Sequence, residues 1–294
     1  METLRLLFNA ITVIFIATTM FAAGLGTTVE ALRSVFTNIP LLALALLVNL
    51  VVVPLLGWGT GALFGLPNAA FIALVLAACS PGGPIGAKLA MVQSGDVIAG
   101  SATQVLLATI GSLTFAPTAN GILNAADIGQ GVALNVAALV GTVALLQLLP
   151  FAVGLLLRRY ATPTARGWHP TAAAVSNVTF LIVLAGMLLG NWRDILALLG
   201  SLTLLAGFVL AAAAFAAGTL LATGPAVRRT TMGGVAAVRN AGPALAAIGI
   251  AFADQPAILG ALAAVLLSGL AAALPIAAVL NSRRNRPTAT RQTH

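Results

Sequence analysis

Long apolar segments with almost no charged side chains make up most of this chain. They lie near residues 4–26, 38–65, 69–91, 96–119, 131–157, 171–191, 195–223, 230–252 and 256–280. A transmembrane helix needs about 20 apolar residues in a row. Charged residues fill only 7% of the 294 positions, whereas a water-soluble domain has about a quarter. The sequence therefore predicts an all-α, polytopic membrane protein with about nine transmembrane helices.

The first apolar segment follows Arg5, as the core of a secretory signal follows a basic residue. Signal cores are only about 7–15 residues long, whereas this segment runs from Leu4 to about Gly26. A related segment also occurs later in the chain. We therefore expect the first segment to be a transmembrane helix.

Basic residues are distributed unequally between the two sides of the predicted topology. Nine spans place the termini on opposite sides, and the N-terminal side holds only Arg5 and Arg193. The C-terminal side holds Arg33, Arg158, Arg159, Arg166, Arg228, Arg229, Arg283, Arg284, Arg286 and Arg291. Loops rich in Lys and Arg stay in the cytoplasm. We predict a multi-pass protein of the cell membrane, with its N-terminus outside and its C-terminus in the cytoplasm.

The net charge of +8 follows from this topology and does not indicate nucleic-acid binding. The single cysteine, Cys79, excludes a disulfide framework and a thiolate zinc site. Residues 281–294 are predicted to form a basic cytoplasmic tail near anionic membrane lipid. We expect no cofactor and no metal site, and the sequence indicates no particular oligomeric state.

The two halves of the chain share a weak internal similarity. The first segment ends in Gly24-Leu25-Gly26 before an acid and a base, and the sixth ends near Gly190 before Arg193-Asp194. Copies five spans apart face opposite ways across the membrane, and such inverted repeats recur in secondary transporters. We predict one transporter domain with a first repeat half at 1–130 (spans 1–4), a fifth span and basic cytoplasmic loop at 131–170, a second repeat half at 171–280 (spans 6–9) and the tail at 281–294.

Two apolar segments, again five spans apart, contain helix-breaking residues at their centres. The third holds Cys79-Ser80-Pro81-Gly82-Gly83-Pro84-Ile85-Gly86, and the eighth holds Val238-Arg239-Asn240-Ala241-Gly242-Pro243. Proline removes a backbone donor and clashes with the preceding turn. Free backbone groups at this depth are tolerated where they line a cavity or are buried in protein. A packed proline kink is the alternative, but paired interruptions predict two broken helices at a midplane transport site.

These residues resemble the bile acid:sodium symporter family. The resemblance rests, in the family's order and over most of the chain, on Met20-Phe21-Ala22-Ala23-Gly24-Leu25, Pro54, Pro81-Gly82-Gly83, Ser94-Gly95-Asp96-Val97 and Arg239-Asn240-Ala241-Gly242. It implies the nine-helix form of the family, with a core domain, a panel domain and two helices that cross at broken points in the core. It also implies that organic anions move together with sodium.

The positions that match the family's sodium ligands differ in chemistry here. They are, by this resemblance, Gly86, Ala87, Gly100, Gln104, Val235, Arg239 and Asn49. Asn240 and Asn49 keep the amide character of the family's residues. Sodium needs clustered oxygen ligands, and nearly all of the family's side-chain oxygens are replaced. Sodium coupling therefore stays open but is not favoured.

Two basic side chains, Lys88 and Arg239, lie close to the predicted helix breaks. A cation at mid-bilayer costs about 2.5–3.5 kcal/mol and usually faces an interior cavity, although a side chain can also snorkel to the interface. Helix N-termini beside the breaks would add free amides and a positive dipole. The fixed cations would then take the place of coupling sodium ions. The expected substrate-binding residues are Arg239, Lys88, Asn240, Gly83, Pro84, Gly86 and Pro243.

The function predicted from these features is secondary transport of a small organic anion, carboxylate or bile-acid-like, by alternating access. A sodium-independent anion facilitator or channel is an alternative that also fits a cationic midplane. A membrane enzyme is a weaker alternative, because His169 lies in a predicted loop, His294 is the last residue and no acid lies deep in a span.

Overall fold

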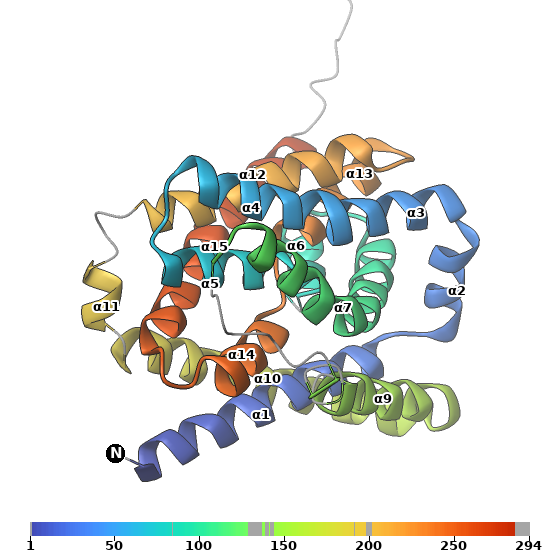
Figure 1. Ribbon diagram of the computed structural model, residues 1–294. Coiled ribbons are helices and arrows are strands. Elements are labelled where there is room, and N and C mark those ends of the chain that lie inside the picture. The colour runs from blue at the N-terminus through green and yellow to red at the C-terminus, as the bar shows by residue number, and fades with distance from the viewer. Residues whose placement is uncertain are drawn as a thin grey trace, which may run out of the picture.

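The structure is a computed structural model, and it describes residues 2–83, 85–128, 137–138, 141, 144–190, 192–197 and 202–285. Its elements are all helices: α1 (Glu2–Gly26), α2 (Val29–Thr37), α3 (Ile39–Leu47), η1 (Val48–Val52), α4 (Val53–Leu63), α5 (Asn68–Ala78), α6 (Ile85–Val92), α7 (Val97–Ala125), η2 (Ala144–Leu148), α9 (Leu149–Tyr160), α10 (Thr162–Gly190), α11 (Trp192–Ala197), α12 (Thr203–Leu221), α13 (Ala226–Ala237), α14 (Ala241–Ala251) and α15 (Pro256–Arg284). The labels η1 and η2 mark π-helical turns. The all-α prediction is confirmed for the described residues (Figure 1).

Six helical stretches among the described residues are long and apolar enough to cross a membrane. They are Leu6–Gly26, Ile39–Leu63, Val97–Ala125, Thr203–Leu221, Ala226–Ala251 and Pro256–Arg284. Each matches one of the expected spans. The third expected span is divided between α5 and α6, the sixth lies within α10, and the fifth includes residues outside the described ranges. The protein is an all-helical polytopic membrane protein, and the count of nine spans stays a prediction.

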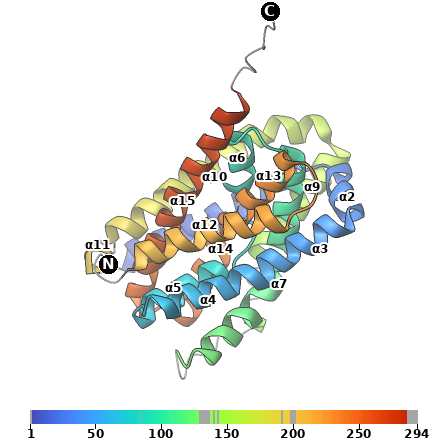
Figure 2. The same cartoon turned by 90° about the horizontal axis from the view of Figure 1, so that it is seen from above.

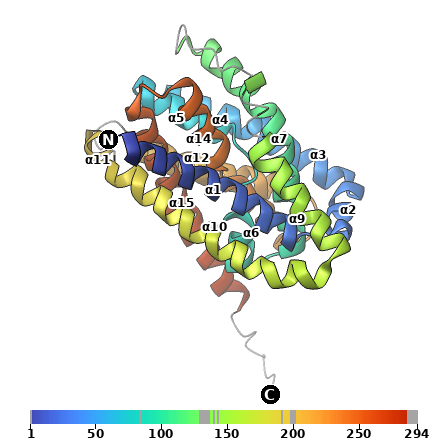
Figure 3. The ribbon, with the colours of Figure 1, turned by 90° about the horizontal axis from the view of Figure 1, so that it is seen from below.

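Three helices form a layer along one side of the molecule. α1 packs against both α9 and α10, and Figure 3 shows the three side by side. A Cβ atom at Gly24 would lie 2.3 Å from the Phe151 carbonyl oxygen, and one at Gly154 would lie 2.5 Å from that of Phe21. The paired glycines therefore let the backbones of α1 and α9 touch. We call α1, η2, α9 and α10 the three-helix layer.

A second group of helices consists of α4 to α7 and α12 to α15, and we call it the main body. Within it, α12 packs against both α13 and α15. Figure 2 shows α15 extending along much of the molecule beside α12 and α13. The main body holds most of the buried apolar side chains.

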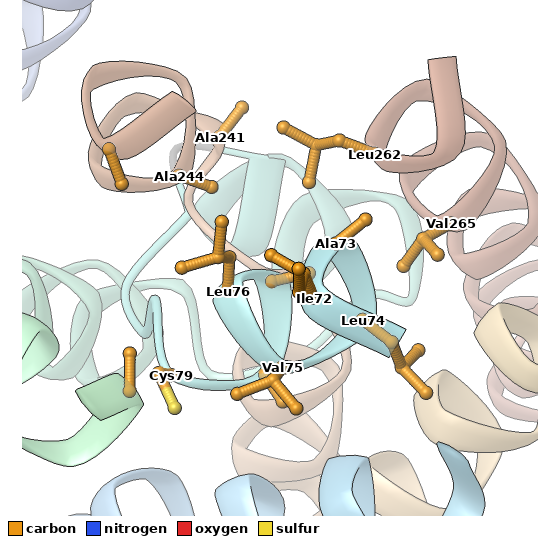
Figure 4. Close-up of a cluster of buried hydrophobic side chains, with 14 of the residues drawn as sticks. Ile72, Ala73, Leu74, Val75, Leu76, Cys79, Ala241, Ala244, Leu262 and Val265 are labelled. Atoms are coloured by element: carbon orange, nitrogen blue, oxygen red, sulfur yellow. The ribbon is translucent and has the colours of Figure 1, made fainter. Parts of the chain in front are cut away.

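The helix α5 lies at the centre of the main body. Every residue from Ala70 to Ala78 is buried, which fits a helix that is apolar on all of its faces. Its side chains pack against α14 and α15 through Ala244 and Leu262 (Figure 4). The apolar core therefore fixes the C-terminal end of α5 deep inside the protein, next to the predicted helix breaks.

Candidate functional site

Two connections between helices, at the predicted helix breaks, contact each other inside the protein. Between α5 and α6 the structure describes residues 79–83, and between α13 and α14 it describes residues 238–240. We call these two stretches the crossing segments. The backbone N–H of Asn240 donates to the Ser80 carbonyl oxygen at 2.8 Å. Segments 160 residues apart in the sequence thus meet inside the protein. Pro84 lies outside the described residues.

Glycine is required in the first crossing segment. Gly82 has a φ of +77°, and a Cβ atom there would lie 2.3 Å from the backbone nitrogen of Ala108 on α7. A Cβ atom at Gly83 would lie 2.4 Å from the carbonyl oxygen of Arg239. A larger residue at either position would push apart the backbones that meet here.

Asn240 caps α14 and also reaches the three-helix layer. Its Oδ1 accepts a hydrogen bond from the backbone N–H of Gly242 at 3.0 Å, which is the role of an N-cap residue. Its Nδ2 donates to Oε1 of Gln147 on η2, also at 3.0 Å. Gln147 was not among the site residues predicted from the sequence, although a glutamine inside an apolar span is itself a signal of an interior polar contact.

The Arg239 side chain is buried and fully hydrogen-bonded. Nη1 donates to Asn49 Oδ1 at 3.0 Å and to the Ala236 carbonyl at 3.1 Å. Nη2 donates to the Ala78 carbonyl at 2.6 Å and to that of Asn49 at 3.3 Å, and Nε donates to that of Ala77 at 3.4 Å. A guanidinium has five N–H donors, so each of them has an acceptor. The side chain is directed to interior oxygens and not to a membrane interface.

Helix ends supply most of these acceptors. The last four carbonyl groups of a helix have no partner within it, and this end carries a partial negative charge. Ala77 and Ala78 end α5, and Ala236 lies in the last turn of α13. The guanidinium therefore lies where the negative ends of two helices converge.

The carbonyl group of Asn49 is free because of a π-helical turn and a proline. In a π-helix each carbonyl accepts from the residue five positions later, as the N–H of Val53 donates to Val48 in η1. The matching partner of Asn49 is Pro54, which has no N–H. This oxygen is therefore left for Arg239. The signal for it, an asparagine five residues before a proline in an apolar span, was present in the sequence.

Lys88 lies on α6 and contacts the three-helix layer. Its Nζ donates to Oδ1 of Asn177 on α10. Both side chains are exposed on the protein. Arg239 lies in the second crossing segment and Lys88 lies on the helix that follows the first. Their surroundings differ, because Arg239 is buried among protein oxygens whereas Lys88 is exposed.

The positions matched to the family's sodium ligands fall into two places. A Cβ atom at Gly86 would lie 3.6 Å from Gln104 Oε1 and 3.8 Å from Val235 Cγ2, and one at Gly100 would lie 3.9 Å from the same Val235 atom. Asn49 meets Arg239 as described above. The side chain of Ala87 lies outside the described atoms. Around Gly86, Gly100 and Val235, the side-chain oxygen comes from Gln104. Around Asn49, the Arg239 guanidinium itself lies among the oxygens.

A mainly apolar cavity adjoins the crossing segments. It offers about 40 Å³ to the centres of water molecules, enough for more than one water by volume. It lies between the three-helix layer, represented by Phe15 and Phe180, and helices α12 and α15. Val238, Arg239 and Ala241 also line it. Pro243 is buried in the first turn of α14, next to this wall.

We predict that the stability of the protein depends on the acceptors of Arg239. Asn49→Leu leaves one N–H of a buried guanidinium unpaired, so the free energy of unfolding should fall by about 1–3 kcal/mol. Asn49→Asp keeps an acceptor and adds an opposite charge, so it should not lower stability. The measurement is the thermal unfolding midpoint of the purified protein in detergent.

Thr103→Val is the matched control. The Thr103 hydroxyl is buried and has no hydrogen-bond partner within the described part of the chain. Its replacement by a methyl group should leave the midpoint unchanged or raise it. A midpoint for Asn49→Leu equal to that of the wild type would contradict the prediction.

Comparison with known proteins identifies the family of this chain. Residues 13–198 match the sequence model of the Sodium Bile acid symporter family. A probable sodium/metabolite cotransporter BASS3, chloroplastic, from Oryza sativa subsp. japonica is 27% identical over 213 residues, which are 71% of this chain and 48% of that protein. The protein of the same name from Arabidopsis thaliana is 26% identical over the same shares. The chain spans about half the length of these curated relatives.

The matched segment covers more than half of the chain and includes the first crossing segment with its glycines. The resemblance noted from the sequence is thereby confirmed at the level of the family. The chain belongs to the sodium bile acid symporter family, which is a family of transporters and not of enzymes.

Proposed function

We propose that this protein is a secondary transporter that moves a small organic anion by alternating access, with its binding site at the crossing segments. The observation that carries the proposal is the contact between the two interruptions, where Asn240 donates to Ser80 and Arg239 is buried beside them. Interrupted helices near the membrane midplane are the usual binding sites of secondary transporters.

The architecture that we propose is an inverted repeat with two broken crossing helices. α5 and α6 form the broken helix of a first half at 1–130, and α13 and α14 form that of a second half at 171–280. The main body would be the core domain, and the three-helix layer would be the panel domain. Residues 131–170 and the tail 281–294 complete this single transporter domain.

The anion would be bound by groups beside the crossing. Lys88 would supply a charge, Asn240 an amide, and the N-terminal turns of α6 and α14 their positive dipole ends. Gly83, Gly86 and Pro243, together with Pro84 by its place in the sequence, are the other proposed binding positions. Arg239 contributes positive potential. Because all five of its N–H donors have acceptors, direct binding of a carboxylate would require it to exchange a protein oxygen for the substrate.

The chemistry of the cavity bears on the rest of the substrate. Its wall is made largely of aliphatic and aromatic side chains, including Leu210, Val265 and Leu266. Burial of apolar surface is favourable at about 25 cal/mol per Å². We therefore propose a substrate with one anionic group and an apolar body, which fits a branched carboxylate or a bile-acid-like molecule.

Transport itself is tested with 2-oxoisovalerate, whose strongly acidic carboxyl group stays ionised and whose isopropyl group is apolar. Purified protein in liposomes should take up the radiolabelled anion with saturation, and internal unlabelled anion should drive counterflow. Empty liposomes are the control. Uptake without saturation or counterflow would favour a facilitator or channel, and no uptake of this or of a bile-acid anion would contradict the proposed substrate class.

Arg239 also bears on coupling, because its guanidinium lies where five protein oxygens converge. We propose that it acts as a tethered cation in place of a coupling sodium ion. The wild type should then be equally stable in sodium and in potassium salts. Arg239→Gln should abolish anion binding, and it should gain a sodium-specific rise in the unfolding midpoint because the oxygens become free to hold an ion.

Arg239→Lys is the second variant, since it keeps the charge and should stay insensitive to sodium if it folds. Both variants are measured by thermal unfolding at matched ionic strength. A sodium-specific stabilisation of the wild type would contradict the tethered-cation proposal and would restore sodium symport as the mechanism.

The orientation that we propose is supported by contacts between segments predicted on one side of the membrane. Arg228, before the eighth span, pairs with Asp96 in the α6–α7 loop at 2.9 Å. Arg284, at the end of α15, donates to the Gln93 carbonyl and to Thr230. We propose that this side, with the C-terminus, is cytoplasmic, where a basic tail would lie near anionic lipid.

Single-cysteine labelling tests this orientation. In a Cys79→Ala background expressed in bacterial cells, Gln255→Cys should react with a membrane-impermeant maleimide in intact cells. Asn285→Cys should react only after permeabilisation, since it lies at the other end of α15. Both positions are exposed on the protein. The reverse labelling pattern would contradict the orientation.

A further inference from the structure

Two hydrogen bonds join the three-helix layer to the main body at residues of the proposed anion site. Asn240 Nδ2 donates to Gln147 Oε1 on η2 at 3.0 Å, and Lys88 Nζ donates to Asn177 Oδ1 on α10. The donors belong to the main body and the acceptors to the layer. The two groups of helices are thus linked through the side chains that would bind the substrate.

The acceptors are chemically alike. Both are carboxamide oxygens, which have the position and the hydrogen-bonding capacity of one carboxylate oxygen but no charge. A carboxylate would accept the same hydrogen bonds from Lys88 and Asn240. For Asn240, a bond to a charged acceptor is roughly twice as strong as its neutral bond to Gln147. For Lys88, whose ammonium group already assists the bond to Asn177, a carboxylate adds the attraction of an opposite charge. A bound carboxylate can therefore displace the carboxamides from these donors.

The two contacts differ in burial, and therefore in how easily each hydrogen bond is exchanged. Gln147 is 1% exposed and Asn240 is 6% exposed, so the loss of one partner leaves the other unpaired in a dry interior, which is costly. Lys88 and Asn177 are exposed, and their contact is more easily exchanged. The inner contact therefore holds the layer in place, and the outer one is the point at which an incoming anion competes first.

We propose that Gln147 and Asn177 are positioning residues that form an amide latch, in which their carboxamide oxygens hold the donors of the empty anion site and release them to a substrate carboxylate. This inference rests on the proposed function. Release frees the three-helix layer from the main body at both contacts. Substrate binding is thereby coupled to the relative movement of the two groups, because a ligand shifts a conformational equilibrium only through differential contacts.

The test compares apolar and acidic replacements at each position. Asn177→Leu and Gln147→Met remove the acceptor, whereas Asn177→Asp and Gln147→Glu turn it into an internal carboxylate. Asn177 is exposed, so its variants are expected to fold even where a charge at the buried position 147 is not tolerated. Thr179→Val on α10 is the control, because the Thr179 hydroxyl donates to the carbonyl oxygens of Val175 and Ser176 within its own helix.

The first measurement is hydrogen exchange of the purified protein without ligand, followed over α9, α10 and the start of α14. The apolar variants should exchange faster there by about two- to tenfold, which corresponds to the loss of one hydrogen bond. The acidic variants should exchange more slowly, and Thr179→Val should match the wild type. Apolar variants that exchange like Thr179→Val would overturn the latch, whether or not an anion binds.

The second measurement is the affinity for 2-oxoisovalerate, obtained from the shift in thermal midpoint with concentration. The apolar variants should bind more tightly than the wild type and the acidic variants more weakly, since the former remove a competitor and the latter strengthen it. A purely structural role would weaken binding in all four variants, and that outcome would overturn the latch. If hydrogen exchange changes in the variants as expected but the wild type does not bind 2-oxoisovalerate, the two contacts do link the layer to the main body. That outcome would count against the proposed substrate class.

Discussion

The Arg239 guanidinium and its five oxygen acceptors impose the strictest requirement on this fold. A buried charge is tolerated only when it is paired and fully hydrogen-bonded, and here no acidic side chain accepts from it among the bonds described. The acceptors come from the ends of α5 and α13 and from η1. These three parts of the chain must therefore be placed together before the charge can be buried, which ties the second span to both crossing segments.

The same arrangement has an electrostatic consequence for the rest of the crossing. The C-terminal ends of α5 and α13 point their carbonyl groups at the cation, so their partial negative charge is balanced. The helices that continue beyond the interruptions, α6 and α14, begin next to the same residues with their positive ends. The negative helix ends are satisfied by the Arg239 side chain, whereas the positive end of α14 is capped by the neutral side chain of Asn240. In the proposed function an anion would bind near the positive ends of α6 and α14. An anion site that carries its own cation is the basis of the proposed sodium independence.

The division into a three-helix layer and a main body connects this chemistry with movement. The layer packs tightly within itself, through the glycines of α1 and α9 and the 2.6 Å contact between the Thr19 and Ser176 hydroxyl groups. The main body packs around α5, which is buried on all sides. Between the two groups lie an apolar cavity and the amide contacts of Lys88 and Asn240. The two groups also share apolar packing, for example of Met20 and Phe151 against Val105 and Ala108 on α7. The polar contacts are therefore the part of this boundary that a bound anion would exchange in the proposed function.

The sequence by itself determined the class of protein, the family and the positions of two non-helical connections. These depend on local properties: apolar length, the missing N–H of proline and the conformational freedom of glycine. It also identified Lys88 and Arg239 as unusual, since a cation in an apolar span is costly wherever it points. Only the tertiary structure decided what these cations contact. The acceptors of Arg239 are mainly backbone carbonyls, which every residue has. The sequence signals one of them, the Asn49 carbonyl five residues before Pro54, but it does not show that Arg239 is the donor. Gln147 and Asn177 were missed for a related reason. An amide in an apolar span indicates a polar contact but does not show its partner, and both partners lie far away in the sequence and are brought close by the packing of helices.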